Sequence, residues 1–246
     1  MNDPMLSLKD VHTHIGAYHI LHGVNLDVPR GKVTILLGRN GAGKSTTLRT
    51  IMGLWQASEG HIHLNGRPIG GMGIQLSTSS IAREGIAYVP EDAGIFSDLT
   101  VAENMILAAR GSKTVDPQRL EWLFELFPAM KKFWHHPAGL LSGGQKQMLA
   151  VSRALAQPRK LLLFDEPSKG LAPAMVHNMI SAFQRLRDSD ATILLVEQNF
   201  NFARQLGDFA VVIEDGRTIY SAPMTELAAD EQLQHRLLGL SADAHH

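Results

Sequence analysis

One eight-residue stretch decides how this chain folds: Gly38-Arg39-Asn40-Gly41-Ala42-Gly43-Lys44-Ser45. It matches the pattern G-x-x-x-x-G-K-[S/T] at every fixed position. The apolar run Val33–Leu37 precedes it and is typical of a strand buried on both faces, while 45–52 is compatible with a helix. Glycines between a strand and a helix let successive backbone N–H groups turn inward and form a cradle for phosphate. The stretch therefore predicts a nucleotide-binding α/β fold.

The side chains at the end of this loop predict how a nucleotide would be held. Lys44 is expected to neutralise the β- and γ-phosphates, and Ser45 to offer its hydroxyl to Mg²⁺. Thr46, which directly follows Ser45, is also expected to contact the nucleotide. A glycine-rich turn with a chance lysine is the alternative, and the strand–loop–helix setting argues against it.

Two carboxylates follow another buried strand, because the apolar run 161–164 leads into Asp165 and Glu166. The carboxyl ends of parallel strands meet at one edge of a sheet, where the phosphate loop also lies. Asp165 is expected to hold Mg²⁺ through water, and Glu166 to accept a proton from an attacking water. An ordinary solvated strand end is the alternative. Its pairing with the phosphate loop favours the catalytic interpretation.

Along the rest of the chain, short β-rich runs alternate with helical patterns, as in a parallel sheet covered by helices. Alternating apolar residues predict a half-exposed strand at 21–28, and apolar spacings of three and four predict an amphipathic helix at 173–187. The segment 96–154 is poor in strand signals, so we expect a mainly helical insertion there. We predict a loop at 66–73, where glycines gather, and a frayed tail at 241–246.

Composition excludes several classes of protein. The chain has 246 residues, no Cys, and 23 Lys+Arg against 24 Asp+Glu. The absence of Cys excludes disulfides, iron–sulfur clusters and thiol catalysis, and the charge balance gives no surplus for gripping nucleic acid. The apolar runs fall far short of the ~20 residues that span a bilayer, and residues 1–10 lack a signal-peptide pattern. We therefore expect a soluble, intracellular globular protein.

A second glycine motif precedes the acidic pair: Leu141-Ser142-Gly143-Gly144-Gln145. Ser142 suits the N-cap of a following helix, and the glycines bare the N–H groups of its first turn. Alone, this motif would indicate only a helix start. The stretches 38–45, 141–145 and 161–167 occur in this order along the chain. Together they give the chain a resemblance to the ATP-binding subunit of ABC transporters. The shorter stretches 88–91, 147–150, 168–173 and 196–199 are most similar to the smaller ATP-binding subunit of branched-chain amino acid importers.

The resemblance implies a P-loop NTPase fold of the ABC ATPase cassette type, with a parallel core sheet, an antiparallel β subdomain and a helical insertion. Residues 1–95 and 155–246 would form the ATP-binding core with its β subdomain, and 96–154 the helical signature subdomain. The implied activity is ATP hydrolysis that drives uptake of amino acids, branched-chain ones in particular, through partner permeases.

The resemblance also implies partners. Two subunits, identical or different, would pack head to tail, with each ATP between one phosphate loop and the partner's signature 142–145. Integral membrane permease subunits would dock near 91–100 and the helical insertion. Within 91–100, Ile95, Phe96 and Leu99 suit a docking groove, and a plain loop with buried anchors is the alternative. A substrate-binding protein would act indirectly. We expect no nucleic acid and no direct membrane insertion, and a peripheral location at the cytoplasmic face of the inner (plasma) membrane.

Three positions depart from the broad family. Glu91 replaces a Gln that reaches Mg²⁺, and a carboxylate there can still ligate Mg²⁺ or orient water. Gln198 replaces a switch His, and its amide can donate the same hydrogen bond but cannot shuttle a proton. Ile15 replaces an aromatic residue that stacks on adenine. His14, Tyr18 or apolar contact alone are the alternatives for holding the base.

Three competing functions remain. The motor of another ABC importer or exporter, of the urea, amide or lipopolysaccharide type, would share all these motifs. A soluble ABC ATPase acting on nucleic acid or ribosomes is disfavoured by the single cassette, the missing heptads and the missing basic surplus. A regulatory module that never hydrolyses is disfavoured by Lys44, Asp165 and Glu166, although Gln198 keeps it open.

Overall fold

The core of the molecule is a six-stranded sheet that carries the predicted phosphate loop. In the computed structural model, which describes residues 3–109 and 114–239, its strand order is β11-β10-β3-β9-β8-β7. All neighbours pair in parallel except β10 and β11. The strands are β3 (Val33–Leu37), β7 (Ile86–Val89), β8 (Leu161–Asp165), β9 (Ile193–Val196), β10 (Phe209–Glu214) and β11 (Arg217–Pro223). The predicted parallel sheet is therefore confirmed. The tail 241–246 lies outside the described residues.

Every residue of β3, β8 and β9 is buried, because both faces of this sheet are covered. Successive side chains enter different cores. Leu162 and Phe164 pack with the helices on one face, whereas Leu161 and Leu163 pack with the second sheet on the other. This explains why these strands are apolar runs without alternation in the sequence.

The second sheet is antiparallel, with strand order β2-β1-β4-β5-β6. Its strands are β1 (Leu6–Ile15), β2 (Tyr18–Val28), β4 (Ala57–Leu64), β5 (Arg67–Gly71) and β6 (Ile74–Gln75). The predicted loop at 66–73 is wrong, since β5 pairs with both β4 and β6. The glycines serve close backbone approach instead: a Cβ on Gly71 would lie 2.3 Å from the Gly60 carbonyl oxygen.

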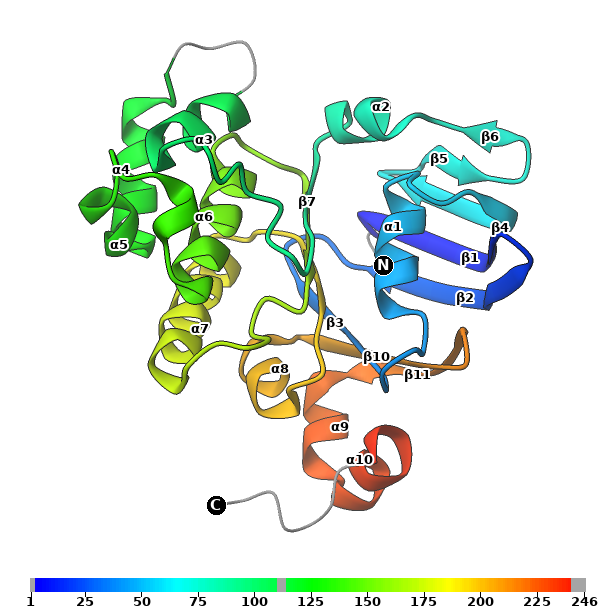
Figure 1. Ribbon diagram of the computed structural model, residues 1–246. Coiled ribbons are helices and arrows are strands. Elements are labelled where there is room, and N and C mark those ends of the chain that lie inside the picture. Colours follow the sequence, from blue (N-terminus) through cyan, green and yellow to red (C-terminus); the bar gives the residue numbers. More distant parts are fainter. Residues whose placement is uncertain (1–2, 110–113, 240–246) are drawn as a thin grey trace.

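Helices fill the segment between β7 and β8, which lies to one side of the core strands, opposite the antiparallel sheet (Figure 1). They are α3 (Val101–Ala108), α4 (Pro117–Leu126), α5 (Pro128–Lys132), a 3₁₀ turn (Ala138–Leu140) and α6 (Gly143–Leu155). Two of them begin with a reciprocal capping box, Thr100 with Glu103 and Ser142 with Gln145.

The remaining helices pack around the core sheet or lie beyond it. They are α1 (Lys44–Ile51), α2 (Thr78–Arg83), α7 (Pro173–Asp188), α8 (Phe200–Leu206), α9 (Met224–Ala229) and α10 (Glu231–Leu238). Edge-to-face contacts of Phe183 with Phe164 and with Phe202 join α7 to β8 and α8. Within residues 3–109 and 114–239, every helix is too short or too polar to cross a bilayer.

Candidate nucleotide site

The glycine loop between β3 and α1 has a backbone that only glycines can adopt without strain. Gly38, Gly41 and Gly43 have φ values of 151°, 82° and 103°. A Cβ on Gly38 would lie 2.3 Å from the Ile213 carbonyl oxygen, and one on Gly43 would lie 2.8 Å from Leu21. The loop shape therefore depends on these glycines. Arg39 and Asn40 are exposed on its outer side, Ala42 is buried, and Thr46 is half-buried in α1.

Lys44 lies inside this loop, with only 4% of its surface exposed. Its Nζ donates to the carbonyl oxygens of Gly38 at 2.9 Å and Arg39 at 3.1 Å. Burial lowers the pKa of Lys44 below its ordinary value, and the Glu166 carboxylate, whose Oε1 lies 3.7 Å from Nζ, acts in the opposite direction. The ammonium group is thus held where phosphate oxygens would replace the two carbonyls.

Ser45 and Asp165 meet as predicted from their positions after β3 and at the end of β8. The Ser45 hydroxyl donates to Asp165 Oδ1 at 2.9 Å, and the Tyr88 hydroxyl donates to Oδ2 at 3.3 Å. Burial raises the pKa of Asp165, with the Ser45 hydrogen bond opposing the change. Burial and the Asp165 carboxylate raise the pKa of Tyr88 to about 12, so the phenol stays a donor. A hydroxyl beside a carboxylate fits Mg²⁺, which prefers oxygen ligands.

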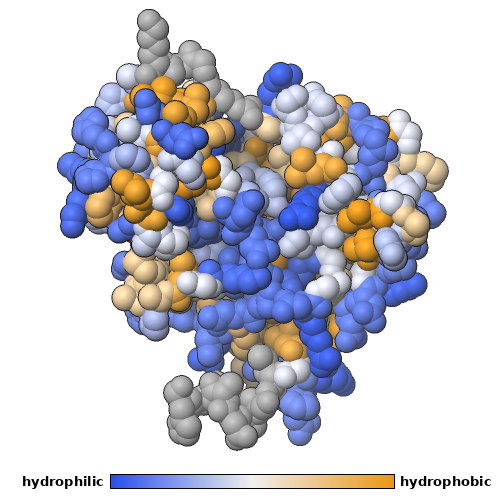
Figure 2. All heavy atoms as spheres, viewed as in Figure 1, coloured by the Kyte–Doolittle hydropathy of each residue, from blue (hydrophilic) through white to orange (hydrophobic). Residues whose placement is uncertain are grey.

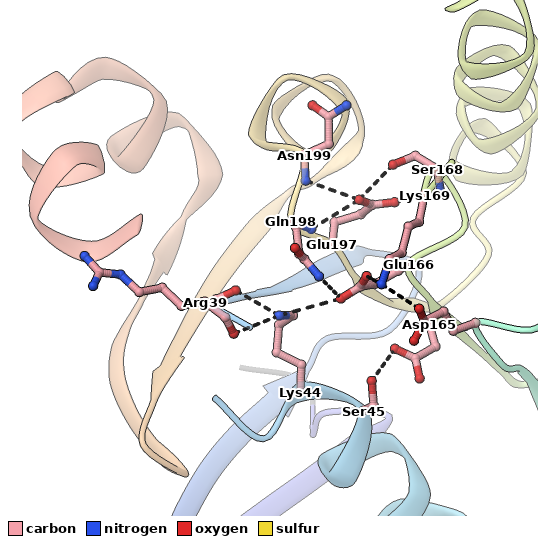
Figure 3. Close-up of polar contacts among 12 residues, drawn as sticks. Arg39, Lys44, Ser45, Asp165, Glu166, Ser168, Lys169, Glu197, Gln198 and Asn199 are labelled. Atoms are coloured by element: carbon pink, nitrogen blue, oxygen red, sulfur yellow. Dashed lines mark hydrogen bonds and ion pairs between the residues drawn. The ribbon is translucent and has the colours of Figure 1, made fainter. Parts of the chain in front are cut away.

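Glu166 stands in a sharp turn directly after β8, with φ at 50°. Such a backbone is unfavourable for a residue with a side chain and is characteristic of functional sites. Its Oε1 accepts from Gln198 Nε2 at 2.5 Å, and its Oε2 lies 3.4 Å from Lys169 Nζ. Figure 3 shows the carboxylate between Lys44, Lys169 and Gln198. The side chain is 6% exposed, so it faces the site and not bulk solvent.

Glu91 joins this group through Lys169, whose Nζ lies 2.6 Å from Glu91 Oε1. Hydrogen bonding to Glu91 and the charge of Glu166 raise the pKa of Lys169. Sequence reasoning missed both Lys169 and Tyr88 as members of the site. The available signal is their place in the stretches 168–173 and 88–91, which carry the similarity to the branched-chain subunits.

The signature 142–145 does not join the phosphate loop within one chain. Ser142 Oγ accepts from the Gln145 backbone, and Gln145 Oε1 accepts from the Ser142 backbone. Neither side chain hydrogen-bonds to the phosphate loop in the part of the chain that the structure describes. Gly143 is exposed, and an added Cβ there would meet no atom within 4 Å. The first turn of α6 thus presents bare backbone to the outside.

The candidates for contact with the base lie at the β1–β2 turn. His14 stacks on His19 with ring centroids 4.1 Å apart, so one face of its ring is occupied. Tyr18 is 75% exposed, and its ring is the more available surface. Ile15 is half-buried beside them.

The predicted docking segment borders a cavity of about 540 Å³ between the helical insertion and the core. Phe96 and Leu107 line it and are about half exposed, and the Arg153 guanidinium lies 4.8 Å above the Phe96 ring. Ile95 and Leu99 are half-buried at its side. On the face that Figure 2 shows, the centre is largely hydrophilic, and hydrophobic groups lie over the helical insertion and the antiparallel sheet.

Comparison with known proteins places the chain in a family. An ABC transporter family model matches residues 21–169. The high-affinity branched-chain amino acid transport ATP-binding protein BraG of Pseudomonas aeruginosa is 41% identical, covering 96% of this chain and all of that protein.

Two solved structures are similar along most of their length. CbiO1 of Clostridium perfringens, part of the ABC transporter complex CbiONQ, has a TM-score of 0.79 and 26% identity, covering 96% of this chain and 94% of that one. The dimeric ATP-binding cassette MJ0796, bound to ADP and Pi, has a TM-score of 0.77 and 25% identity, covering 89% and 99%. The sequence, the fold and the site therefore agree that this chain belongs to the ABC transporter family.

Proposed function

We propose that this chain is the ATP-hydrolysing motor subunit of an importer that takes up amino acids, with branched-chain amino acids as the substrate class. The observation that carries the ATPase proposal is the position of Glu166, 3.7 Å from Lys44 and 2.5 Å from Gln198 beside the Ser45–Asp165 pair. The substrate class rests on the 41% identity to BraG along the whole of that protein.

The phosphates of ATP would lie on the backbone N–H groups of 38–46, with Lys44 Nζ turning from its carbonyl partners to the β- and γ-phosphates. Ser45 and Asp165 would hold Mg²⁺, and Glu91 would be a further ligand. Bound there, Mg²⁺ supplies positive charge to the phosphate oxygens. Because Glu91 now pairs with Lys169, it would have to exchange that partner when it binds the metal.

Glu166 would act as the general base, accepting a proton from the water that attacks the γ-phosphate. Its neighbour Gln198 donates to the same carboxylate and would orient it together with the water. An amide cannot carry the proton away, so proton transfer would rest on Glu166 alone. The position of a carboxylate beside a buried ammonium group therefore supports hydrolysis over a purely regulatory role.

A second subunit would complete the site, since Ser142 and Gly143 are exposed at the surface of their own chain. We infer a head-to-tail dimer in which Ser142, Gly143, Gly144 and Gln145 contact the nucleotide of the partner. In this arrangement 1–95 and 155–246 form the ATP-binding core, and 96–154 acts as the signature subdomain. Permease subunits would dock at the cavity beside Phe96 and hold the chain at the cytoplasmic face of the inner membrane, with a substrate-binding protein acting through them.

Purification of the assembled transporter tests this function. The chain should co-purify with membrane permease subunits, and leucine-loaded binding protein should stimulate ATP hydrolysis by the complex in vesicles. Glu166→Gln is the matched control and should lower hydrolysis by ~10² while ATP still binds, because only the base is lost. Stimulation only by amino acids outside the branched-chain class would overturn the substrate class, and unchanged turnover of Glu166→Gln would remove Glu166 from catalysis.

A further inference from the structure

Glu197 is a buried carboxylate that has no role in the chemistry described above. It follows β9 directly and is 2% exposed. Four hydrogen bonds end on its two oxygens. Ser168 donates from its backbone N at 3.0 Å and its Oγ at 2.9 Å, and the backbone N–H groups of Gln198 and Asn199 donate at 3.2 and 3.4 Å. Figure 3 shows these donors converging on it from two separate loops.

Burying a carboxylate costs free energy because the charged form loses its hydration. Burial accordingly raises the pKa of Glu197 to about 7, although the four donors act in the opposite direction. A glutamine would carry no charge, but it cannot replace the carboxylate. It has one acceptor oxygen, and in either orientation its NH₂ group would face a backbone N–H donor. The arrangement is therefore specific for a carboxylate.

The two loops that Glu197 joins carry the two ends of the Glu166–Gln198 contact. Strands β8 and β9 pair in parallel with Asp165 opposite Val196, which sets Glu166 and Glu197 side by side. Ser168 lies two residues beyond Glu166, and Gln198 is the next residue after Glu197. The Glu197 carboxylate binds backbone N–H groups of both loops. It therefore fixes the distance between Glu166 Oε1 and Gln198 Nε2.

We propose that Glu197 is a positioning residue for ATP hydrolysis, bracing the loop after β8 against the loop after β9 so that Gln198 holds Glu166 in place. This inference rests on the proposed role of Glu166 as the general base. Glu197 itself touches neither the phosphate loop nor the Ser45–Asp165 pair in the described part of the chain, so it acts through its neighbours.

The test separates turnover from binding in the assembled complex. Glu197→Gln should lower kcat by ~10-fold or more, because a small displacement of reacting groups is enough for such a loss. The Kd for ATP, measured by calorimetry on the purified chain, should stay within ~3-fold, since phosphate binding uses other groups. In a Gln198→Ala background the same substitution should change kcat by less than ~2-fold, because the contact it supports is already lost.

Ser168→Ala provides a second variant that removes one of the four donors and leaves the carboxylate satisfied. It should lower kcat by ~3-fold, again without effect in the Gln198→Ala background, and it carries the test if Glu197→Gln does not fold. Wild-type turnover of either folded variant, equal losses in kcat and ATP affinity, or additive effects with Gln198→Ala would overturn the inference. Glu166→Gln separates the failure of this inference from the failure of the proposed function. If Glu166→Gln hydrolyses ATP normally, the role of Glu166 as general base is wrong; if it is inactive while the Glu197 variants turn over normally, only the role of Glu197 is wrong.

Discussion

At the scale of single residues, the site places charged side chains from separate segments of the chain within a few ångströms of one another. Lys44 is buried with its pKa lowered, and Glu166 is held between two lysines and an amide. The contact of Ser45 with Asp165 could be predicted, because parallel strands end at one edge of a sheet. The place of Lys169 could not, because it depends on the positive φ of Glu166 directly after β8. The Glu197–Ser168 contact could not either, because its partners are 29 residues apart and leave no local signal.

Lys44→Ala tests the phosphate loop at this scale. The substitution removes the one ammonium group inside the loop and leaves the glycine backbone intact. We expect ATP affinity to fall by ~10² or more, since a charge-assisted contact with phosphate is lost in a buried setting. Calorimetric titration measures this, and Lys131→Ala, which removes an exposed cation paired with Glu121 on the helical insertion, is the control. Equal affinities for Lys44→Ala and the unmodified chain would contradict the assignment.

Glu197 also makes a prediction about stability and pH. Burial raises its pKa from the ordinary glutamate value of 4.5 to about 7 in the fold, so the folded state binds the proton more tightly. The resulting stabilisation is complete below pH 4.5 and is lost as the pH rises through 7. Between pH 4.5 and 8, the free energy of unfolding should therefore fall by ~3 kcal/mol more in the unmodified chain than in Glu197→Gln. Urea unfolding at a series of pH values measures the difference, and parallel curves would refute it.

At the scale of elements, the glycines of β5 show what a single sequence cannot reveal. The glycines gathered at 66–73 predict a loop if only the local sequence is considered. In the structure, however, Gly71 has a φ of 116° and lies against the β4 backbone. That contact is between strands and has no local signal. The N-cap Ser142, by contrast, was predictable, because the cap and its partner Gln145 are three residues apart.

Gly71→Ala tests this explanation of β5. An added Cβ would lie 2.3 Å from the Gly60 carbonyl oxygen and 2.9 Å from His61 Cα, and backbone cannot move away cheaply. Gly73→Ala is a matched control in the same hairpin, with φ at 79° and no atom within 4 Å. We expect losses of about 3 kcal/mol for Gly71→Ala and about 1 kcal/mol for Gly73→Ala in urea unfolding. Equal losses would mean that the close approach of β4 and β5 contributes nothing.

At the scale of the whole molecule, we propose that the chain carries two halves of different nucleotide sites. The phosphate loop and Glu166 lie on the core, whereas 142–145 opens outward with its own polar groups satisfied. A head-to-tail dimer would complete two sites, each with a loop from one subunit and a signature from the other. This arrangement differs from two self-contained sites in a way that mixed dimers can measure.

Two substitutions inactivate separate half-sites in such dimers. Lys44→Ala removes the loop cation, and Gly143→Asp places a carboxylate where the partner's γ-phosphate would bind. The aspartate should not disturb folding, since position 143 is open and a carboxylate suits the start of α6.

Differently tagged chains, both also carrying Glu166→Gln to trap ATP, allow each mixed dimer to be purified. With one substitution on each chain, one intact site should remain, and one ATP per dimer should stay bound. With both substitutions on the same chain, a head-to-tail dimer has no intact site and should retain none. The reverse outcome, retention only when both substitutions share a chain, would show that each subunit binds ATP with its own signature.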